Sequence, residues 1–332
     1  MGMADNNIFC YPRAKDFIFT IFDDTDVTTL DYIRPIYDFL NSIGLKTTKS
    51  VWPCDYKGRS SYAGSHSLEH REYAEYMKQL YDRGFEIAYH GASMESSNRE
   101  RVEESFDIFY KVFGCYPSTY ASHAGNQENL YWGIDRFSIP FFRLLSCMSF
   151  KGKKNYYQGH IKSSPFFWGD ISRRYIKYVR NFTYNDINLL NISNKLPYKD
   201  EKKEWINQFF FTSDAENVED FNQLINEDNQ DKLEKQKGIC IISTHFGKGF
   251  LVDGKVHKRT KELLSIMSKR NGWFVPVVEV LDFLASRRQS TLITSRELFL
   301  LEFKWFLHAF IRKLKRHTYK KTEVPYLRSS TL

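Results

Sequence analysis

The run Phe-Ile-Phe-Thr-Ile-Phe at 17–22 constrains this chain most, because it ends abruptly in Asp23, Asp24 and Asp26. Six residues without polar alternation predict a strand that is buried on both faces, as in a parallel sheet. Several like charges at the end of a buried strand are costly unless a cation or a shared proton offsets them. The cluster therefore indicates either a metal or acid–base site, or a helix N-terminus that needs only one cap, such as Thr28.

Strand and helix patterns alternate along the chain after this run. Apolar residues recur at helical spacing in 31–43, 67–83 and 98–113, and short strand-like runs lie between these segments. The predicted strands are 17–22, 46–52, 85–89, 118–122 and 238–244. The stretch 135–235 is less regular and is expected to be an insertion with one further strand-like run at 175–182. This rhythm predicts an α/β fold built on a parallel sheet or barrel.

Four of the predicted strands end in chemically active side chains. Asp23 and Asp24 follow the first strand, and His90, His123 and His245 follow three later ones. The carboxyl ends of parallel barrel strands open on one face, so these side chains are expected to converge there. Carboxylate and neutral imidazole suit a divalent metal such as Zn²⁺, with Co²⁺, Ni²⁺ and Fe²⁺ as alternatives. For any one of these histidines, a role in core packing or at the surface is the alternative.

Charge and cysteine usage narrow the function classes. The net charge of +8 belongs entirely to residues 286–332, which hold 11 Lys/Arg and 3 Asp/Glu. Residues 1–285 hold 37 Lys/Arg and 37 Asp/Glu and are therefore neutral overall. A charge-neutral body argues against nucleic acid as a partner. The five cysteines are scattered and form no CxxC pair, which argues against a disulfide framework or a cysteine-based zinc site. The N-terminus has no basic region followed by an apolar stretch, so a cytoplasmic location is expected.

Several of these segments resemble the NodB-homology polysaccharide deacetylases. The resemblance begins with Phe-Asp-Asp at 22–24, Gly-Phe-Glu-Ile-Ala-Tyr-His at 84–90 and Ser-Thr-His at 243–245. Within that superfamily the chain is most similar to a WbmS-like branch associated with bacterial surface-polysaccharide gene clusters. The further similar segments are 90–94, 122–126, 131–133, 167–170, 178–182 and 244–247. The resemblance covers about residues 15–285.

The resemblance implies a distorted (β/α)₇ barrel and metal-dependent removal of N- or O-acetyl groups from sugars in surface-polysaccharide (lipopolysaccharide or capsule) biosynthesis. By position, it implies that Asp23 is the general base and Asp24 a metal ligand. It makes His90 a metal ligand and His245 the general acid, while Asp26 is expected to belong to the turn. We expect this barrel to span 1–285, with 286–332 as a separate tail.

The chain also departs from the family pattern. Met94 stands where typical members have a second metal histidine, and a thioether does not replace imidazole for such metals. His123 is expected to supply the missing ligand from the neighbouring strand. The usual Arg-Pro-Pro-Tyr motif is absent at 120–123, and Arg180 is expected to steady the base instead. A catalytically inactive barrel that binds glycan or acts as a scaffold is the alternative.

The expected substrate contacts lie in the similar segments. They are Asn126, Trp132, Trp168, Asp170 and Arg180. Trp132 and Trp168, with Phe167, are expected to form a wall that stacks on a sugar ring, although packing in the core explains such aromatics equally well.

Residues 296–316 are predicted to form a basic amphipathic helix. Phe299, Phe303, Phe306, Phe310 and Leu314 recur on one face, and basic residues accumulate toward its end. Such a helix is typical of a peripheral anchor on the inner-membrane surface, which would suit a lipid-linked sugar substrate. A helix docked on the barrel or on a partner subunit is the alternative.

Overall fold

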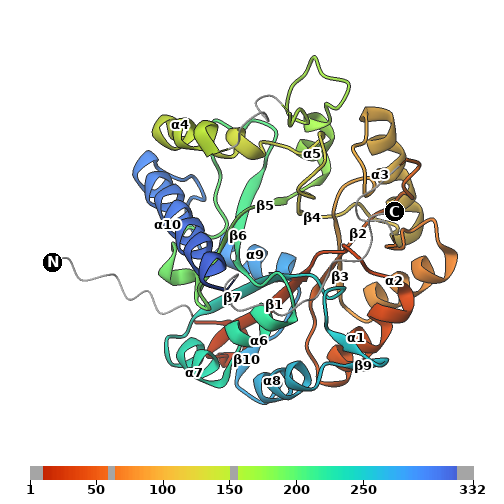
Figure 1. Cartoon of the computed structure of the whole chain (residues 1–332), viewed down its shortest axis with the longest axis vertical. Helices are drawn as coiled ribbons and strands as arrows, with labels where there is room; N and C mark the ends of the chain where they lie inside the picture. Colours follow the sequence, from red (N-terminus) through yellow and green to blue (C-terminus); the bar gives the residue numbers. More distant parts are fainter. Residues whose placement is uncertain (1–9, 59–63, 150–155, 320–332) are drawn as a thin grey trace.

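The computed structural model describes residues 10–58, 64–149 and 156–319 and shows a closed parallel barrel ringed by helices (Figure 1). Strands β1 to β7 pair in chain order, and β1 pairs with β7 to close the barrel. The short β10 adds a pair at the start of β1, and β8 and β9 form a separate hairpin. The barrel strands are β1 (Phe17–Asp23), β2 (Thr48–Val51), β3 (Glu86–Tyr89), β4 (Thr119–Tyr120), β5 (Tyr178–Tyr184), β6 (Gln208–Asp214) and β7 (Ile239–Thr244). The additional strands are β8 (Leu251–Val252), β9 (Lys255–Val256) and β10 (Gly272–Trp273).

The described helices follow the alternating rhythm that the sequence predicts. Gly114, with a φ of 72°, ends α3 in the left-handed conformation that favours glycine. The α-helices are α1 (Leu30–Ser42), α2 (Arg71–Asp82), α3 (Arg99–Phe113), α4 (Pro140–Ser149), α5 (Gly169–Tyr175), α6 (Val218–Leu224), α7 (Glu227–Lys235), α8 (Lys258–Ser268), α9 (Val277–Ser286) and α10 (Ser295–Tyr319). The 3₁₀ turns are η1 (Pro12–Ala14), η2 (Gly133–Arg136) and η3 (Leu189–Asn191).

The stretch 135–235, expected as an insertion with one strand, contributes two strands to the barrel, β5 and β6. The two strands pair in parallel from Tyr178↔Gln208 onward. The run Phe209-Phe-Phe211 in β6 is fully buried or nearly so, and its few apolar residues carry no periodicity that distinguishes a strand from a helix.

Strand β1 separates two apolar layers. Phe17, Phe19 and Ile21 pack with the surrounding helices, whereas Ile18 and Phe22 belong to the other layer. The Phe22 ring lies 6.0 Å from that of Phe210 on β6, which is two strands away around the barrel. Alternate residues of β1 therefore face the helices and the barrel interior, as the period of two in a strand requires.

Helix α10 is docked on the barrel along one face. Leu298, Leu301 and Glu302 are buried there, and two backbone amides, those of Ser138 and Ile139, donate to the Glu302 carboxylate. The other face leaves six apolar side chains exposed. They are Phe299, Leu300, Phe303, Leu307, Phe310 and Ile311.

Helix α4 covers part of the predicted apolar face of the tail helix. The rings of Phe299 and Phe306, which share one face of α10 as predicted, each lie 5.2 Å from the ring of Phe142 on α4. The side chain of Leu314 lies outside the described residues. Of the helices in the described ranges, none combines the length and the apolar character that crossing a bilayer requires.

Candidate active site

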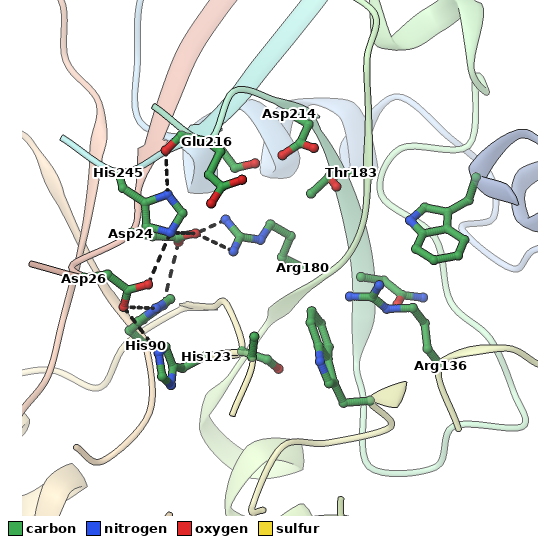
Figure 2. A pocket seen from close by; sticks show the side chains of 16 residues that line it. Asp24, Asp26, His90, His123, Arg136, Arg180, Thr183, Asp214, Glu216 and His245 are labelled. Atoms are coloured by element: carbon green, nitrogen blue, oxygen red, sulfur yellow. Dashed lines mark hydrogen bonds and ion pairs between the residues drawn. The ribbon is translucent and has the colours of Figure 1, made fainter. Parts of the chain in front are cut away.

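A cavity of about 280 Å³ opens at the carboxyl ends of the barrel strands (Figure 2). Its volume is near the lower end of the range for ligand pockets, which begins at about 300 Å³. Five strands contribute polar side chains at or just beyond their carboxyl ends, β5 contributes from its length, and α10 contributes Trp305. The lining residues are Asp24, Asp26, His90, Ser122, His123, Ala124, Trp132, Arg136, Arg180, Asn181, Thr183, Asp214, Glu216, Ser243, His245 and Trp305.

Asp26 lies at the centre of three imidazoles (Figure 2). Its Oδ1 is 3.4 Å from His90 Nε2 and 3.6 Å from His123 Nε2. Its Oδ2 is 3.2 Å from His245 Nε2. The sequence-based expectation that Asp26 belongs only to the turn is therefore wrong, because the structure buries its carboxylate in the cavity.

The pKa values in this cluster follow from burial and from the opposite charges within it. Burial raises the pKa of Asp26, but the neighbouring imidazoles of His245, His90 and His123 outweigh burial and hold that pKa well below its usual range. Burial lowers the pKa of His245, but Asp26 and Asp24 outweigh it, so the pKa of His245 is raised. The pKa of His123 is lowered, chiefly by burial. His245 therefore retains a proton more readily than His123 does.

Asp24 is held by Arg180 in a two-point ion pair. Arg180 Nη1 lies 3.0 Å from Asp24 Oδ1, and Nη2 lies 2.7 Å from Oδ2. Burial raises the pKa of Asp24, but the Arg180 guanidinium and the imidazoles of His90 and His245 outweigh it, so the pKa is lowered. Asp24 is thus ionised at neutral pH, and its orientation is set by a planar fork. Arg180, expected to steady the general base, contacts Asp24.

Asp23 does not line the cavity, although it precedes Asp24 directly. Its carboxylate is fully buried in the layer behind the barrel wall, 3.0 Å from the ammonium of Lys49. The backbone N–H of Phe246 and the hydroxyl of Tyr37 donate to the same carboxylate. Burial raises the pKa of Asp23, and Lys49 offsets part of this effect. A general base must reach the reacting water, and Asp23 does not, so its position does not agree with the predicted role. Asp23 faces away from the cavity because successive residues of a strand point to opposite sides.

Asn126 lies behind His123 and sets the proton on its ring. The amide nitrogen of Asn126 donates to the Ser93 carbonyl and to Glu128, each at 3.0 Å. Its Oδ1 therefore accepts from His123 Nδ1, at 3.1 Å. A neutral ring with its proton on Nδ1 directs the lone pair of Nε2 toward Asp26. Asn126 was expected to bind substrate, but it does not line the cavity and instead orients His123.

Trp168 and Asp170 also lie outside the cavity. Trp168 is buried in the core, and its Nε1 donates to the Glu128 carbonyl at 2.6 Å. Asp170 pairs with Arg99 at 2.8 Å in a separate surface hollow. Trp168 therefore forms no sugar-stacking wall with Trp132, and Asp170 does not face the cavity.

The structure brings together six of the ten residues that the sequence analysis selected. These are Asp24, His90, His123, Trp132, Arg180 and His245. Sequence reasoning missed Asp26, Arg136 and Trp305. Asp26 lies two residues after Asp24, and this spacing could have indicated that both face the same side. Arg136 follows the similar segment 131–133 closely. No local pattern connects Trp305, in the tail, to the cavity.

The donor set in the cavity fits a divalent metal by its chemistry. Asp26 Oδ1 and both ring nitrogens of His90 are buried and make no hydrogen bond. A lone pair of His123 facing a carboxylate at 3.6 Å is unfavourable unless a proton or a cation lies between them. Across the described ranges, however, no group of three or more His, Cys, Asp or Glu side chains is arranged as the ligands of a metal ion are. Metal binding would therefore require these side chains to shift.

Comparisons with known proteins give remote structural matches. No family model matches the chain, and no curated protein matches its sequence. A solved structure named "putative polysaccharide deacetylase", from Mycobacterium smegmatis, matches with a TM-score of 0.48 and 12% identity over 86% of this chain and 96% of that one. PuuE allantoinase matches with a TM-score of 0.48 and 11% identity over 84% and 93%. A family 4 acetyl xylan esterase from Clostridium thermocellum, in complex with a cobalt ion, matches with a TM-score of 0.40 and 12% identity over 83% and 94%.

Proposed function

We propose that this chain is a hydrolase that removes N- or O-acetyl groups from a carbohydrate in the assembly of a bacterial surface polysaccharide. One observation carries the proposal. Asp26 faces His90 and His123 in the open cavity, beside Asp24, which Arg180 holds, and His245. The motifs at the strand ends, which resemble those of polysaccharide deacetylases, support carbohydrate as the substrate class.

Asp26, His90 and His123 are the residues that would hold a divalent metal. One carboxylate and two imidazoles form a donor set typical of Zn²⁺, and the same donors accept Co²⁺, Ni²⁺ or Fe²⁺. When bound, such an ion polarises an acyl carbonyl and lowers the pKa of a water molecule. Asn126 keeps the proton of His123 on Nδ1, so that Nε2 is available as a donor.

Asp24 and His245 are the residues placed to move protons. Asp24 is ionised and oriented by Arg180, so its carboxylate can accept the proton of the attacking water. His245 donates from Nδ1 to the Glu216 carbonyl at 3.0 Å, which directs Nε2 into the cavity. Asp26 and Asp24 outweigh burial and raise the pKa of His245, which favours the protonated ring that can transfer its proton to the leaving amine or alcohol.

A second candidate function is a glycan-binding or scaffold protein without catalysis. One observation favours this function: no group of three or more His, Cys, Asp or Glu side chains among the described residues is arranged as the ligands of a metal ion are. In that case the pairs between Asp26 and the histidines would serve only to stabilise buried charges.

Metal content and acetate release together test the proposal. The purified full-length chain is incubated with Zn²⁺ or Co²⁺, freed of excess metal, and assayed by elemental analysis and with acetylated amino sugars and sugar esters. We expect about one metal ion per chain, metal-dependent acetate release, and loss of both in Asp26→Asn and His90→Ala. Asp170→Asn, outside the cavity, is the matched control and should retain both. A folded wild-type chain that binds no metal after reconstitution would support the non-catalytic function.

The tail suggests a peripheral contact with the inner-membrane surface, which would bring the cavity to a lipid-linked sugar. The exposed face of α10 is extended by Phe141 and Leu144 of the neighbouring α4. Six of the ten residues 312–321 are Lys or Arg. An apolar face followed by basic residues is suited to an anionic lipid surface.

Vesicle co-sedimentation tests this contact. Truncation before α10 would remove Leu301 and Trp305 from the barrel, so the full-length variant Phe303→Ser/Phe310→Ser is the better probe. We expect wild type to pellet with vesicles that contain phosphatidylglycerol, and the variant to remain in solution. Equal pelleting of both, or of neither, would contradict the contact.

A further inference from the structure

Arg136 lies at the edge of the cavity among aromatic rings and away from Asp26 (Figure 2). It ends the turn η2, and its guanidinium carbon is 3.7 Å from the ring centroid of Trp132. The rings of Phe182 and Trp305 lie 5.5 and 5.7 Å away. All three rings lie within cation–π distance of the guanidinium, and Arg136 lines the cavity.

The charge of Arg136 is not balanced as those of the neighbouring arginines are. Arg180 pairs with Asp24, and Arg143 pairs with Asp135 at 2.8 Å. Within the described ranges no carboxylate forms an ion pair with Arg136, and its buried Nε makes no hydrogen bond. Burial, and after it the charge of Arg180, lowers the pKa of Arg136 to about 9. The guanidinium is still protonated at neutral pH, so the cavity contains a half-buried cation for which the described residues supply no counter-ion.

We propose that Arg136 binds an anionic group of the substrate, a carboxylate or a phosphate, and that the chain therefore acts on an acidic sugar. The identity of the ligand as a sugar rests on the proposed function; the anion site rests on the geometry of Arg136. A guanidinium binds either oxyanion with two parallel hydrogen bonds. The indoles of Trp132 and Trp305 flank this position and are suited to contact the apolar faces of a sugar ring.

The proposed anion site also gives the substrate a direction. Figure 2 shows Arg136 and the cluster of Asp24, Asp26 and His245 on different sides of the cavity, with Arg180 between them. An anionic group held by Arg136 would orient the rest of the sugar toward that cluster. Arg136 is thus a binding and specificity residue and does not take part in proton transfer.

Binding measurements with matched sugars test the proposal. The full-length chain is titrated calorimetrically with N-acetylglucosamine, with its 1-phosphate and with the corresponding uronic acid. We expect at least one anionic sugar to bind about 10- to 100-fold more tightly than the neutral one, because a hydrogen bond to a charged group contributes about 1.5–3 kcal/mol. The two anionic compounds distinguish a phosphate from a carboxylate. In Arg136→Gln this preference should disappear while the affinity for N-acetylglucosamine is unchanged, and Arg136→Lys should retain part of it.

Arg259→Gln is the matched control, because Arg259 pairs with Glu227 on the surface away from the cavity. It should leave the preference unchanged. Unchanged affinity of Arg136→Gln for the neutral sugar excludes misfolding as the cause of a lost preference. Equal affinity of wild type for all three sugars, no binding of any of them, or an unchanged preference in Arg136→Gln would overturn the proposal. Preference for an acidic sugar without acetate release would contradict only the hydrolase function, and acetate release with no such preference would contradict only the anion site.

Discussion

Asp23 and Asp24 are adjacent in the chain, yet they occupy two different regions. Asp23 lies in the layer between barrel and helices, where it pairs with Lys49, and both side chains are fully buried. Asp24 lies in the cavity, where it pairs with Arg180. Both are carboxylates beside a cation, but only Asp24 shares a water-accessible cavity with the histidines. The comparison shows that a buried ion pair indicates chemistry only when it is open to a substrate.

The largest expected effect is a loss of activity when Asp24 is substituted. Asp24→Asn should lower acetate release by about 10²–10⁴-fold, because it removes the carboxylate placed to accept a proton. Initial rates with the metal-loaded chain measure this effect, and circular dichroism monitors folding. Asp170→Asn should keep the wild-type rate. A folded Asp24→Asn variant with the wild-type rate would remove Asp24 from the mechanism.

The second effect is a loss of stability when Asp23 is substituted. Asp23→Asn leaves the Lys49 ammonium buried without its counter-charge, so the free energy of unfolding should fall by about 3–5 kcal/mol. The double variant Asp23→Leu/Lys49→Met should lose less than Asp23→Asn, because it leaves no buried charge behind. Urea unfolding at constant pH measures both. If Asp23→Asn retains its stability but loses its activity, Asp23 acts in catalysis and the comparison fails.

A third, smaller effect concerns the residue behind His123. Asn126→Ala removes the acceptor that fixes the His123 ring, so metal affinity should fall by about 10–100-fold. Competition with a chromophoric chelator measures that affinity. Asn191→Ala, at an exposed position, is the control. An unchanged affinity in Asn126→Ala would show that His123 is not positioned through this hydrogen bond.

The smallest expected effect concerns Glu302, a buried carboxylate that accepts hydrogen bonds from backbone amides. Burial raises the pKa of Glu302 from its ordinary value of 4.5 to about 7. Between these values folded Glu302 holds a proton that it loses in the unfolded chain, so the stability that Glu302 contributes is fully present below pH 4.5 and is lost as the pH rises through 7. The loss should not exceed about 1.4 kcal/mol per pH unit.

Urea unfolding of wild type and Glu302→Gln between pH 5 and 7.5 checks this dependence. The variant lacks the titrating group, so its stability should fall less steeply with pH over this range. Parallel curves for the two proteins would show that Glu302 does not titrate in this window.

Much of the fold could be predicted because its signals are local. The alternation of apolar strands and amphipathic helices around 17–113 predicts a parallel α/β fold, and the structure confirms a closed seven-stranded barrel. Strand β6 was missed because three buried phenylalanines show no period. The convergence of His90, His123 and His245 on one cavity agrees with the expectation from their positions at strand ends.

The candidate site was only partly predictable. The opposite orientations of Asp23 and Asp24 follow from strand alternation and could have been read from Phe17 to Phe22 in the sequence. Asn126, Trp168 and Asp170 belong to segments that resemble a family, but resemblance does not show whether a side chain faces the cavity or the layer behind it.

The sequence by itself indicated the barrel strands other than β6, the strand ends that carry carboxylate or imidazole, and which residues of β1 face the same side. These properties depend on neighbouring residues and on the period of two. Only the tertiary structure decided that Asp26 lies among three histidines, that Arg180 pairs with Asp24, and that Trp305 of α10 flanks Arg136 of η2. Such contacts join residues far apart in the chain, and their geometry depends on the closure of the barrel by β1 and β7.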